Sequence, residues 1–191
     1  MRLFMALAVN KPVRDYLRKE VQMMRRQIPG RSWVPYQNYH ITLHFLGETD
    51  RIADLCYAME ESAQGLDALR LQISSIGRLI RPKSATMVAR ISDACGELYE
   101  LYDALKANLS KRNIPIENRR FYPHITLARS LESNDVTRFV RPLDDGPIWT
   151  TQSFTLYNST FVSDHMLYTP IHTQLICPAY HSRGGVAMEK M

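Results

Sequence analysis

The sequence has few cysteines and no long run of apolar residues. Its three cysteines, Cys56, Cys95 and Cys177, lie far apart and form no Cys-x-x-Cys pair. This spacing argues against a disulfide framework and against a cysteine-based metal site, and it favours a reducing compartment. No apolar stretch approaches the roughly 20 residues that a membrane-spanning helix needs. We therefore expect a cytoplasmic protein with no membrane partner.

A cleavable signal peptide is also not expected. The apolar start at residues 1–9 ends at Asn10-Lys11-Pro12, and no small-residue cleavage site follows it. This pattern favours a buried first strand. The 191 residues, with 45% hydrophobic and 23% charged residues, are typical of one globular domain or of two tightly joined lobes. The net charge of +5 favours an anionic partner only slightly.

Helical and extended patterns are mixed along the chain. Apolar residues at helical spacing predict a helix ending near residue 28, a second helix after residue 50, a third over 95–112 and a short one over 134–141. Extended runs predict strands over 2–9, 39–46, 69–79, 85–92, 121–129, 149–162 and 166–176. Without strict strand–helix–strand alternation, an α+β fold with mainly antiparallel sheets is expected. Residues 1–178 are expected to form one domain and residues 179–191 a C-terminal tail.

One tetrapeptide, His-Ile-Thr-Leu, occurs twice, at residues 40–43 and 124–127. The offset of 84 residues (124 − 40) is close to half of the chain, which indicates a duplicated unit and a pseudo-two-fold architecture. Because side chains alternate between the faces of a strand, the histidine and threonine of each copy share one face. Two such strands side by side would place two imidazoles and two hydroxyls in one groove. A purely structural repeat stays the alternative.

This set of side chains suits phosphodiester chemistry. One neutral histidine can take a proton from attacking water, and one protonated histidine can give a proton to the leaving oxygen. Threonine hydroxyls can donate hydrogen bonds to phosphate oxygens as charge builds. The scheme requires no cofactor. His40 and His44 are four residues apart, but that spacing suits a metal site only on a helix, and no Glu stands at the needed place.

The flanks of the two motifs carry a family resemblance. The chain resembles the 2H phosphoesterase superfamily, and more closely the bacterial RNA 2′,3′-cyclic phosphodiesterases, also called 2′-5′ RNA ligases. The resemblance covers about residues 1–177, and its strongest segments are 1–4, 33–35, 40–47, 121–129, 154–157 and 168–170.

The resemblance implies a bilobal fold in which two antiparallel sheets line a central cleft, with helices outside. It implies that His40 donates a proton to the leaving oxygen and that His124 accepts one from water. Thr42 and Thr126 would bind the phosphate of an RNA or oligonucleotide with a 2′,3′-cyclic phosphate end. The implied product is a 2′-phosphate end, with a reversible 2′-5′ ligation as a further activity.

Four more residues are candidate contacts. His44 stands where similar sequences often carry Lys or Arg, and it is expected to share the face of His40, as a substrate contact or as a rim residue without a role. Arg129 has odd parity relative to His124, yet a turn at the strand end would bring its guanidinium to the phosphate. Phe45 and Tyr122 are candidates for stacking on bases, with core packing as the alternative.

Two basic segments are ambiguous. Arg78, Arg81 and Lys83, and separately Arg119-Arg120, would follow an RNA backbone or form solvated turns. Three functions stay open from the sequence: the RNA cyclic phosphodiesterase, a related enzyme for small cyclic nucleotides or 2′-5′ oligoadenylates, and a non-catalytic module that binds RNA ends. A monomer is expected.

Overall fold

The computed structural model describes residues 1–28, 32–81, 84–117, 119–131, 136–162 and 165–176. The helices are α1 (Lys11–Arg25), α2 (Ile52–Ala63), α3 (Glu97–Lys111) and the 3₁₀ helix η1 (Tyr36–Asn38). The strands are β1 (Arg2–Ala8), β2 (Ser32–Trp33), β3 (His40–Glu48), β4 (Leu69–Arg81), β5 (Ser84–Asp93), β6 (His124–Leu131), β7 (Arg141–Pro142), β8 (Ile148–Thr151), β9 (Ser153–Val162) and β10 (His165–Leu175). The tail expected at 179–191 and the loop residues Pro82 and Lys83 lie outside the described residues.

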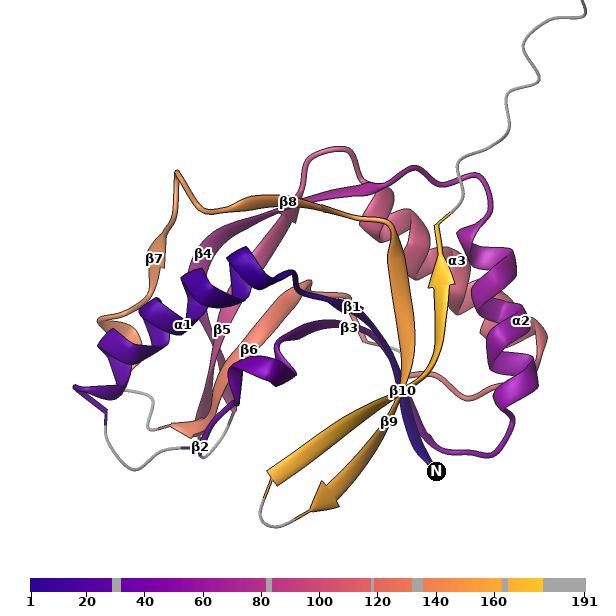
Figure 1. The fold of residues 1–191 in the computed structure, drawn as a ribbon, viewed down its shortest axis with the longest axis horizontal. Helices are drawn as coiled ribbons and strands as arrows, with labels where there is room; N and C mark the ends of the chain where they lie inside the picture. The colour runs from indigo at the N-terminus through magenta and orange to yellow at the C-terminus, as the bar shows by residue number, and fades with distance from the viewer. Residues whose placement is uncertain (29–31, 82–83, 118, 132–135, 163–164, 177–191) are drawn as a thin grey trace, which may run out of the picture.

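All strand pairs are antiparallel, so the expected α+β class with mainly antiparallel strands is confirmed (Figure 1). The strand order is β10-β9-β1-β3-β6-β5-β4-β7, with β2 beside β6 and β8 beside β4. The structure has one continuous sheet where two sheets were expected. The two halves are joined where Ile41 of β3 pairs with Ile125 of β6, so the hydrogen-bonded strands form one ten-stranded sheet.

The fold repeats a strand–helix–strand unit, first as β1-α1-β3 and then as β5-α3-β6. Each unit is followed by a strand that joins the opposite half of the sheet. β4, which follows the first unit, pairs with β5, and β9, which follows the second unit, pairs with β1. Each half-sheet therefore contains strands from both halves of the chain.

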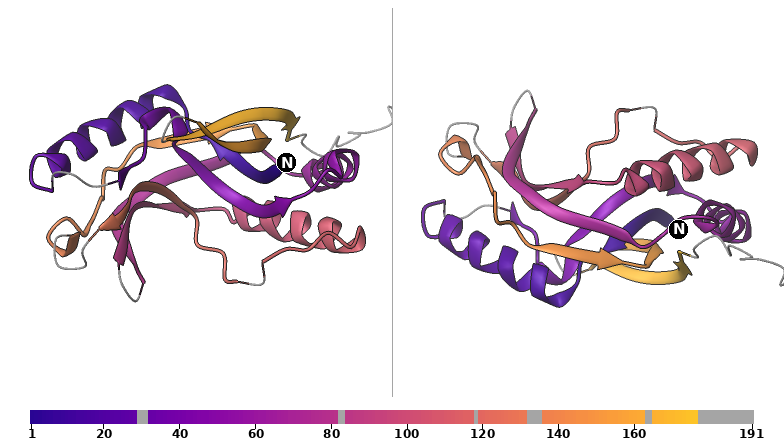
Figure 2. Two further views of the ribbon diagram at one scale, coloured as in Figure 1. Left: turned by 90° about the horizontal axis from the view of Figure 1, so that it is seen from below. Right: turned by 90° about the horizontal axis from the view of Figure 1, so that it is seen from above.

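The helices also cross over between the halves. α1 begins at Asn10, whose side chain accepts a hydrogen bond from Val13 N, and Pro12 stands in its first turn. The buried Glu20 of α1 pairs with Arg141 of β7 in the second half-sheet at 2.5 Å. α3 packs against α2, where Arg112 pairs with Glu61 at 2.9 Å. α1 and α3 lie at opposite ends of the molecule (Figure 2).

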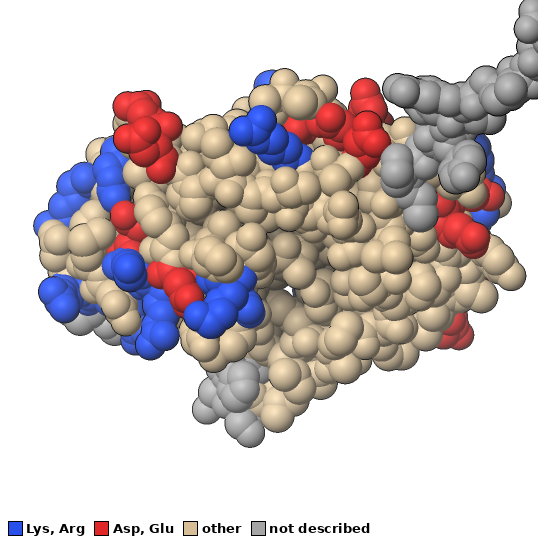
Figure 3. Space-filling model, turned by 45° about the horizontal axis from the view of Figure 1, so that its top comes forward, with Lys and Arg blue, Asp and Glu red and all other residues tan. Residues whose placement is uncertain are grey.

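Charge is unevenly distributed over the fold. Lys and Arg side chains gather at the left end of the molecule, where Figure 1 places α1 and β7 (Figure 3). The helix α2 contains Asp54, Glu60 and Glu61 and has no Lys or Arg. In the residues that the structure describes, no helix is long and apolar enough to cross a membrane.

Most predicted elements are confirmed, and the differences are short segments. β2, η1 and β7 span two or three residues each and have too little hydrophobic pattern to be predicted. The strand expected over 121–129 begins only at His124, and the one expected over 149–162 is divided into β8 and β9. The short helix expected over 134–141 falls partly on residues 132–135, outside the described residues.

Because one cluster of buried apolar side chains spans both halves, we expect the chain to unfold as a unit. Leu17 of α1 is fully buried, and Leu17→Ala should lower the free energy of unfolding by about 2–5 kcal/mol. Urea denaturation followed by circular dichroism and by tryptophan fluorescence should give coincident transitions in both proteins. Two separated transitions in the wild-type chain would contradict this expectation.

Candidate functional site

The two motif strands, β3 and β6, lie side by side at the centre of the sheet. Ile41 and Ile125 are fully buried, whereas His40 and His124 are only partly buried. Thr42 and Thr126 have the same intermediate exposure as the histidines. The alternation expected for each motif is therefore confirmed. His40 and His124 precede Ile41 and Ile125, which pair directly across the two strands.

Each motif strand contains an extra residue directly after the threonine. In β3, Thr42 pairs with Ala6 while His44 pairs with Met5, so Leu43 has no partner in β1. In β6, Thr126 pairs with Val88 and Ala128 pairs with Met87, so Leu127 is the extra residue. A β-bulge of this kind reverses which face the following side chains point to.

The bulges explain which of the flanking residues reach the site. Phe45 and Arg129, which simple alternation places on the buried face, are exposed and line the cavities beside the histidines. They occupy equivalent positions in the two copies, five residues after the histidine. The duplicated scaffold therefore presents an aromatic ring from β3 and a guanidinium from β6 at equivalent positions.

The prediction that His44 shares the face of His40 is wrong. His44 is 4% exposed, because the bulge at Leu43 turns it away from the cleft. Its ring stacks on Tyr102 of α3 at 4.3 Å between centroids, and its Nε2 lies 3.0 Å from the Tyr102 carbonyl oxygen. Since a carbonyl can only accept, Nε2 carries the proton in this bond. His44 connects β3 to α3 and does not contact substrate from this position.

Each central histidine is oriented by a backbone carbonyl two residues earlier. His40 Nδ1 lies 2.7 Å from the Asn38 oxygen, and His124 Nδ1 lies 2.5 Å from the Tyr122 oxygen. Because the carbonyl accepts, Nδ1 must be the protonated nitrogen of the neutral ring in both cases. The Nε2 atom is then left to exchange a proton. In His40 it lies 3.1 Å from the Thr42 hydroxyl, which donates to it when the ring is neutral.

The segment that precedes each histidine is held by the opposite motif strand. Before His40, Trp33 of β2 pairs with Ala128 of β6, and Val34 N donates to the Leu127 oxygen at 2.9 Å. Before His124, Phe121 stacks on Tyr102 at 4.1 Å, and Tyr102 in turn stacks on His44 of β3. Each motif therefore helps to fix the carbonyl that orients the histidine of the other.

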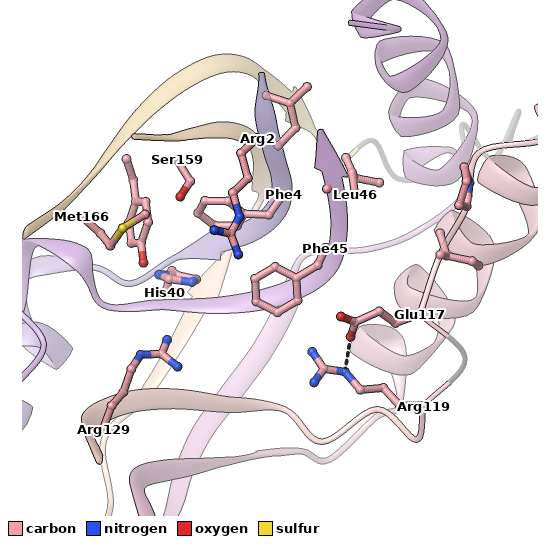
Figure 4. A pocket seen from close by; sticks show the side chains of 15 residues that line it. Arg2, Phe4, His40, Phe45, Leu46, Glu117, Arg119, Arg129, Ser159 and Met166 are labelled. Atoms are coloured by element: carbon pink, nitrogen blue, oxygen red, sulfur yellow. Dashed lines mark ion pairs between the residues drawn. The ribbon is translucent and has the colours of Figure 1, made fainter. Parts of the chain in front are cut away.

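Two cavities flank the histidines and confirm the expected central cleft. The larger, of about 740 Å³, borders His40 and has an aromatic wall that includes Phe4, Phe45 and Tyr168. The smaller, of about 290 Å³, borders His124, Thr42 and Thr126. The cavities share Phe45, Arg119 and Arg129, which Figure 4 shows in the lining of the larger one. In Figure 4, Phe45 lies between His40 and Arg119.

Burial and neighbouring cations favour the neutral form of both central imidazoles. Burial lowers the pKa of His40 to about 4, with further lowering by Arg129 and His124. The pKa of His124 is lowered mainly by burial and then by Arg119, Arg129 and Arg90. Three guanidiniums therefore lower the pKa of His124, whereas only one lowers that of His40. An anion bound between the rings would favour their protonated forms and raise both pKa values.

The cleft includes most of the predicted residues and several others. Tyr122 is exposed and lines the smaller cavity, as do Arg119 and Arg120. Arg78 lines neither cavity and donates to the Thr137 hydroxyl instead. Sequence reasoning missed Arg2, Phe4, Ser159, Met166 and Tyr168. Among the described residues, no group of three or more His, Cys, Asp or Glu is placed to hold a metal ion.

Comparisons with known proteins agree with the family resemblance. The family model described as the 2′-5′ RNA ligase superfamily matches residues 13–159. The RNA 2′,3′-cyclic phosphodiesterase of Thermotoga maritima is 26% identical over 176 residues, covering 90% of this chain and 94% of that protein. The protein of the same name from Escherichia coli is 25% identical, covering 89% and 93%. The crystal structure of TT0787 of Thermus thermophilus superposes with a TM-score of 0.79 at 27% identity, covering 95% of this chain and all of that one.

The lowered pKa of His40 predicts a specific loss of stability in acid. The unfolded chain binds a proton near pH 6.5, whereas folded His40 binds one only near pH 4, so this stability is complete above pH 6.5 and is lost as the pH falls toward 4. The loss should reach up to about 3 kcal/mol. His40→Asn should flatten the dependence of the free energy of unfolding on pH in urea titrations. Parallel curves for the two proteins would contradict the assignment.

His44→Ala should affect stability more than binding in the cleft. Because the change removes a buried hydrogen bond and a ring stack, it should lower the free energy of unfolding by about 1–3 kcal/mol. Phe45→Ala is the matched control, since the neighbouring Phe45 is 41% exposed and its loss should cost less. Urea denaturation of both variants tests this, and an unchanged stability of His44→Ala would argue against the structural role.

Proposed function

Because the chain belongs to the 2′-5′ RNA ligase superfamily, we propose that it opens 2′,3′-cyclic phosphate ends of RNA to 2′-phosphate ends. The observation that carries this proposal is the pair of imidazoles that flank one cleft. In each, Nδ1 is occupied by a carbonyl and Nε2 is left for proton transfer. General acid–base catalysis of a phosphodiester reaction needs two such groups, one on each side of the phosphorus atom. The names of the relatives from T. maritima and E. coli support the same activity.

The unequal cavities support the division of roles between the histidines. A cavity of about 740 Å³ falls within the usual range for a small-molecule ligand and can take a nucleoside, whereas one of about 290 Å³ falls at the lower limit. The nucleoside then lies on the His40 side, and its leaving oxygen faces His40. The attacking water approaches from the opposite side, where His124 lies. His40 is therefore the proton donor and His124 the proton acceptor.

The reaction follows from these positions. Water attacks the phosphorus atom, and its proton passes to Nε2 of His124. The bond between phosphorus and the 3′-oxygen breaks, and that oxygen takes a proton from Nε2 of His40. His40 is neutral in the free protein, so the bound phosphate anion must first raise its pKa for it to carry this proton. The 2′-oxygen stays bonded to phosphorus, which gives the 2′-phosphate.

Other cleft residues support the phosphate and the base. Thr42, Thr126 and Arg129 line the space beside the histidines and bind the phosphate oxygens. Phe45 borders both cavities and offers a ring for a base to stack on. The Phe45 ring has one guanidinium, that of Arg119, at 5.4 Å from its centroid. The Tyr122 ring has two, those of Arg120 and Arg90 at 5.2 and 5.9 Å, so it is the weaker stacking candidate.

The same chemistry with a 5′-hydroxyl in place of water would join two strands by a reversible 2′-5′ linkage, which the superfamily description suggests. Small cyclic nucleotides and 2′-5′ oligoadenylates are the alternative substrates, and a module that binds RNA ends without turnover is the alternative function. We also propose that residues 1–178 act as a single domain, as a monomer, in the cytoplasm. The free thiols of Cys56 and Cys95 fit a reducing compartment.

Purified protein should hydrolyse a nucleoside 2′,3′-cyclic phosphate in EDTA, with a bell-shaped pH profile. His40→Ala and His124→Ala should each lower kcat/KM by roughly 10²–10⁴-fold. The double variant should fall little further, because the two groups act in one step. His172→Ala is the control, since His172 lines neither cavity of the cleft and should keep full activity.

A substrate panel of tRNA halves, cyclic mononucleotides and 2′-5′ dinucleotides distinguishes the related enzymes. Full activity in either His40→Ala or His124→Ala would contradict the assigned roles. Tight binding of a 2′-phosphate oligonucleotide without any turnover would instead support the non-catalytic module.

A further inference from the structure

The His124 side of the cleft holds more positive charge than one cyclic phosphate can balance. Arg119, Arg120 and Arg129 line the smaller cavity, and Arg90 lies beside it against Tyr122. Arg119 forms an ion pair with Glu117 at 2.7 Å. In the part of the chain that the structure describes, no carboxylate pairs with the other three guanidiniums.

Counting charges shows the surplus. A 2′,3′-cyclic phosphate has one negative charge, which Arg129 between the two cavities can balance. Glu117 balances Arg119. Arg90 and Arg120 then remain without a counter-charge, although like charges held close together repel each other. A second anionic group would relieve this repulsion.

The backbone allows this arrangement at one specific glycine. Gly77 of β4 lies under the Arg90 side chain, and a Cβ atom at this position would come within 2.6 Å of Arg90 Nε. The absence of a side chain lets Arg90 lie over β4 at Gly77, with its guanidinium 5.9 Å from the centroid of the Tyr122 ring. Arg120 is 5.2 Å from the centroid of the same ring. Tyr122 therefore holds both cations near His124 through cation–π contacts.

We propose that Arg90, Arg119 and Arg120 form a subsite for a second phosphate, contributed by a strand whose 5′-hydroxyl attacks in place of water. The inference rests on the proposed function, because it uses the roles of His40 and His124. The nucleophile enters from the His124 side, opposite the leaving oxygen. Water needs no extra cations there, whereas a 5′-hydroxyl end of RNA is followed by a phosphodiester at its own 3′-oxygen. The smaller cavity suits a phosphate with part of its ribose.

The chemistry balances without a co-reactant. The 5′-oxygen of the second strand bonds to phosphorus, and its proton passes to His124 Nε2. The bond from phosphorus to the 3′-oxygen breaks, and the 3′-oxygen takes the proton of His40 Nε2. The product is a 2′-5′ phosphodiester. One proton is taken up and one is released, so the net number of bound protons does not change.

The test measures how one cyclic phosphate is divided between two nucleophiles. Adenosine 2′,3′-cyclic phosphate is incubated with the dinucleotide ApA, which has a free 5′-hydroxyl, and the ratio of 2′-5′ transfer to hydrolysis is measured. Both reactions use the same cyclic phosphate and the same histidines, so a change in the ratio reports a change in how the acceptor strand is bound. The double variant Arg90→Ala/Arg120→Ala should lower this ratio by about tenfold. Gly77→Ala, which displaces Arg90 but keeps its charge, should lower it in the same direction.

Two controls make the outcome specific. Arg70→Ala removes an exposed arginine that lines neither cavity, and it should leave the ratio unchanged. Adenosine as acceptor has a 5′-hydroxyl without a phosphate, so transfer to it should be insensitive to the double variant. An unchanged ratio with ApA would overturn the subsite. A selective loss of hydrolysis of ApA with a 2′,3′-cyclic phosphate end would also overturn it, by placing the second phosphate on the donor strand. Failure of the proposed function can be distinguished from failure of the subsite, because in the first case the wild-type protein would not hydrolyse the cyclic phosphate at all.

Discussion

The cleft depends on the hydrogen bond that each central histidine donates from Nδ1 to the carbonyl oxygen two residues earlier. This bond selects the tautomer, so the remaining nitrogen of each ring is available in the cleft. It also requires the fold to fix two carbonyl groups that lie outside the sheet, that of Asn38 at the end of η1 and that of Tyr122 in the segment before β6. The structure fixes each carbonyl group through contacts between its segment and the opposite motif strand. β2 and Val34 attach the segment before His40 to β6, and a ring stack through Tyr102 attaches the segment before His124 to His44 of β3.

The two copies of the motif must differ in their side chains, because one side of the cleft faces the leaving oxygen and the other faces the attacking water. The backbone repeats closely, even to the bulge that follows each threonine. The difference lies in the side chains that the bulges expose, Phe45 in one copy and Arg129 in the other. Around this pair, both cavities are lined by aromatic residues and arginines, but three guanidiniums lower the pKa of His124 and only one lowers that of His40. The two sides of the cleft thus differ in the charge around their histidines.

The sequence was sufficient for the α+β class, for the long elements and for placing the two motif strands side by side. The repeat of His-Ile-Thr-Leu can be recognised without any knowledge of tertiary contacts. Alternation within a strand correctly placed Thr42 and Thr126 on the same face as the histidine of their motif. Alternation failed at His44, because a bulge depends on the register with β1, which no local pattern reports. The same cause brought Arg129 into the cleft. Phe4 and Tyr168 were missed because tertiary pairing alone brings β1 and β10 beside His40.

The exchange of strands and helices between the halves has a consequence for how such a chain could arise. If the two strand–helix–strand units descend from one shorter ancestor, that ancestor could not have completed its own half-sheet, because the strand beside β1 comes from the second half and the strand beside β5 from the first. A single copy would have needed a twin to supply the missing strand, in a two-fold symmetric dimer with its active groups at the subunit boundary. Fusion of the two copies would then have freed each half to change separately, and only after that step could one motif strand present Phe45 and the other Arg129 at equivalent positions.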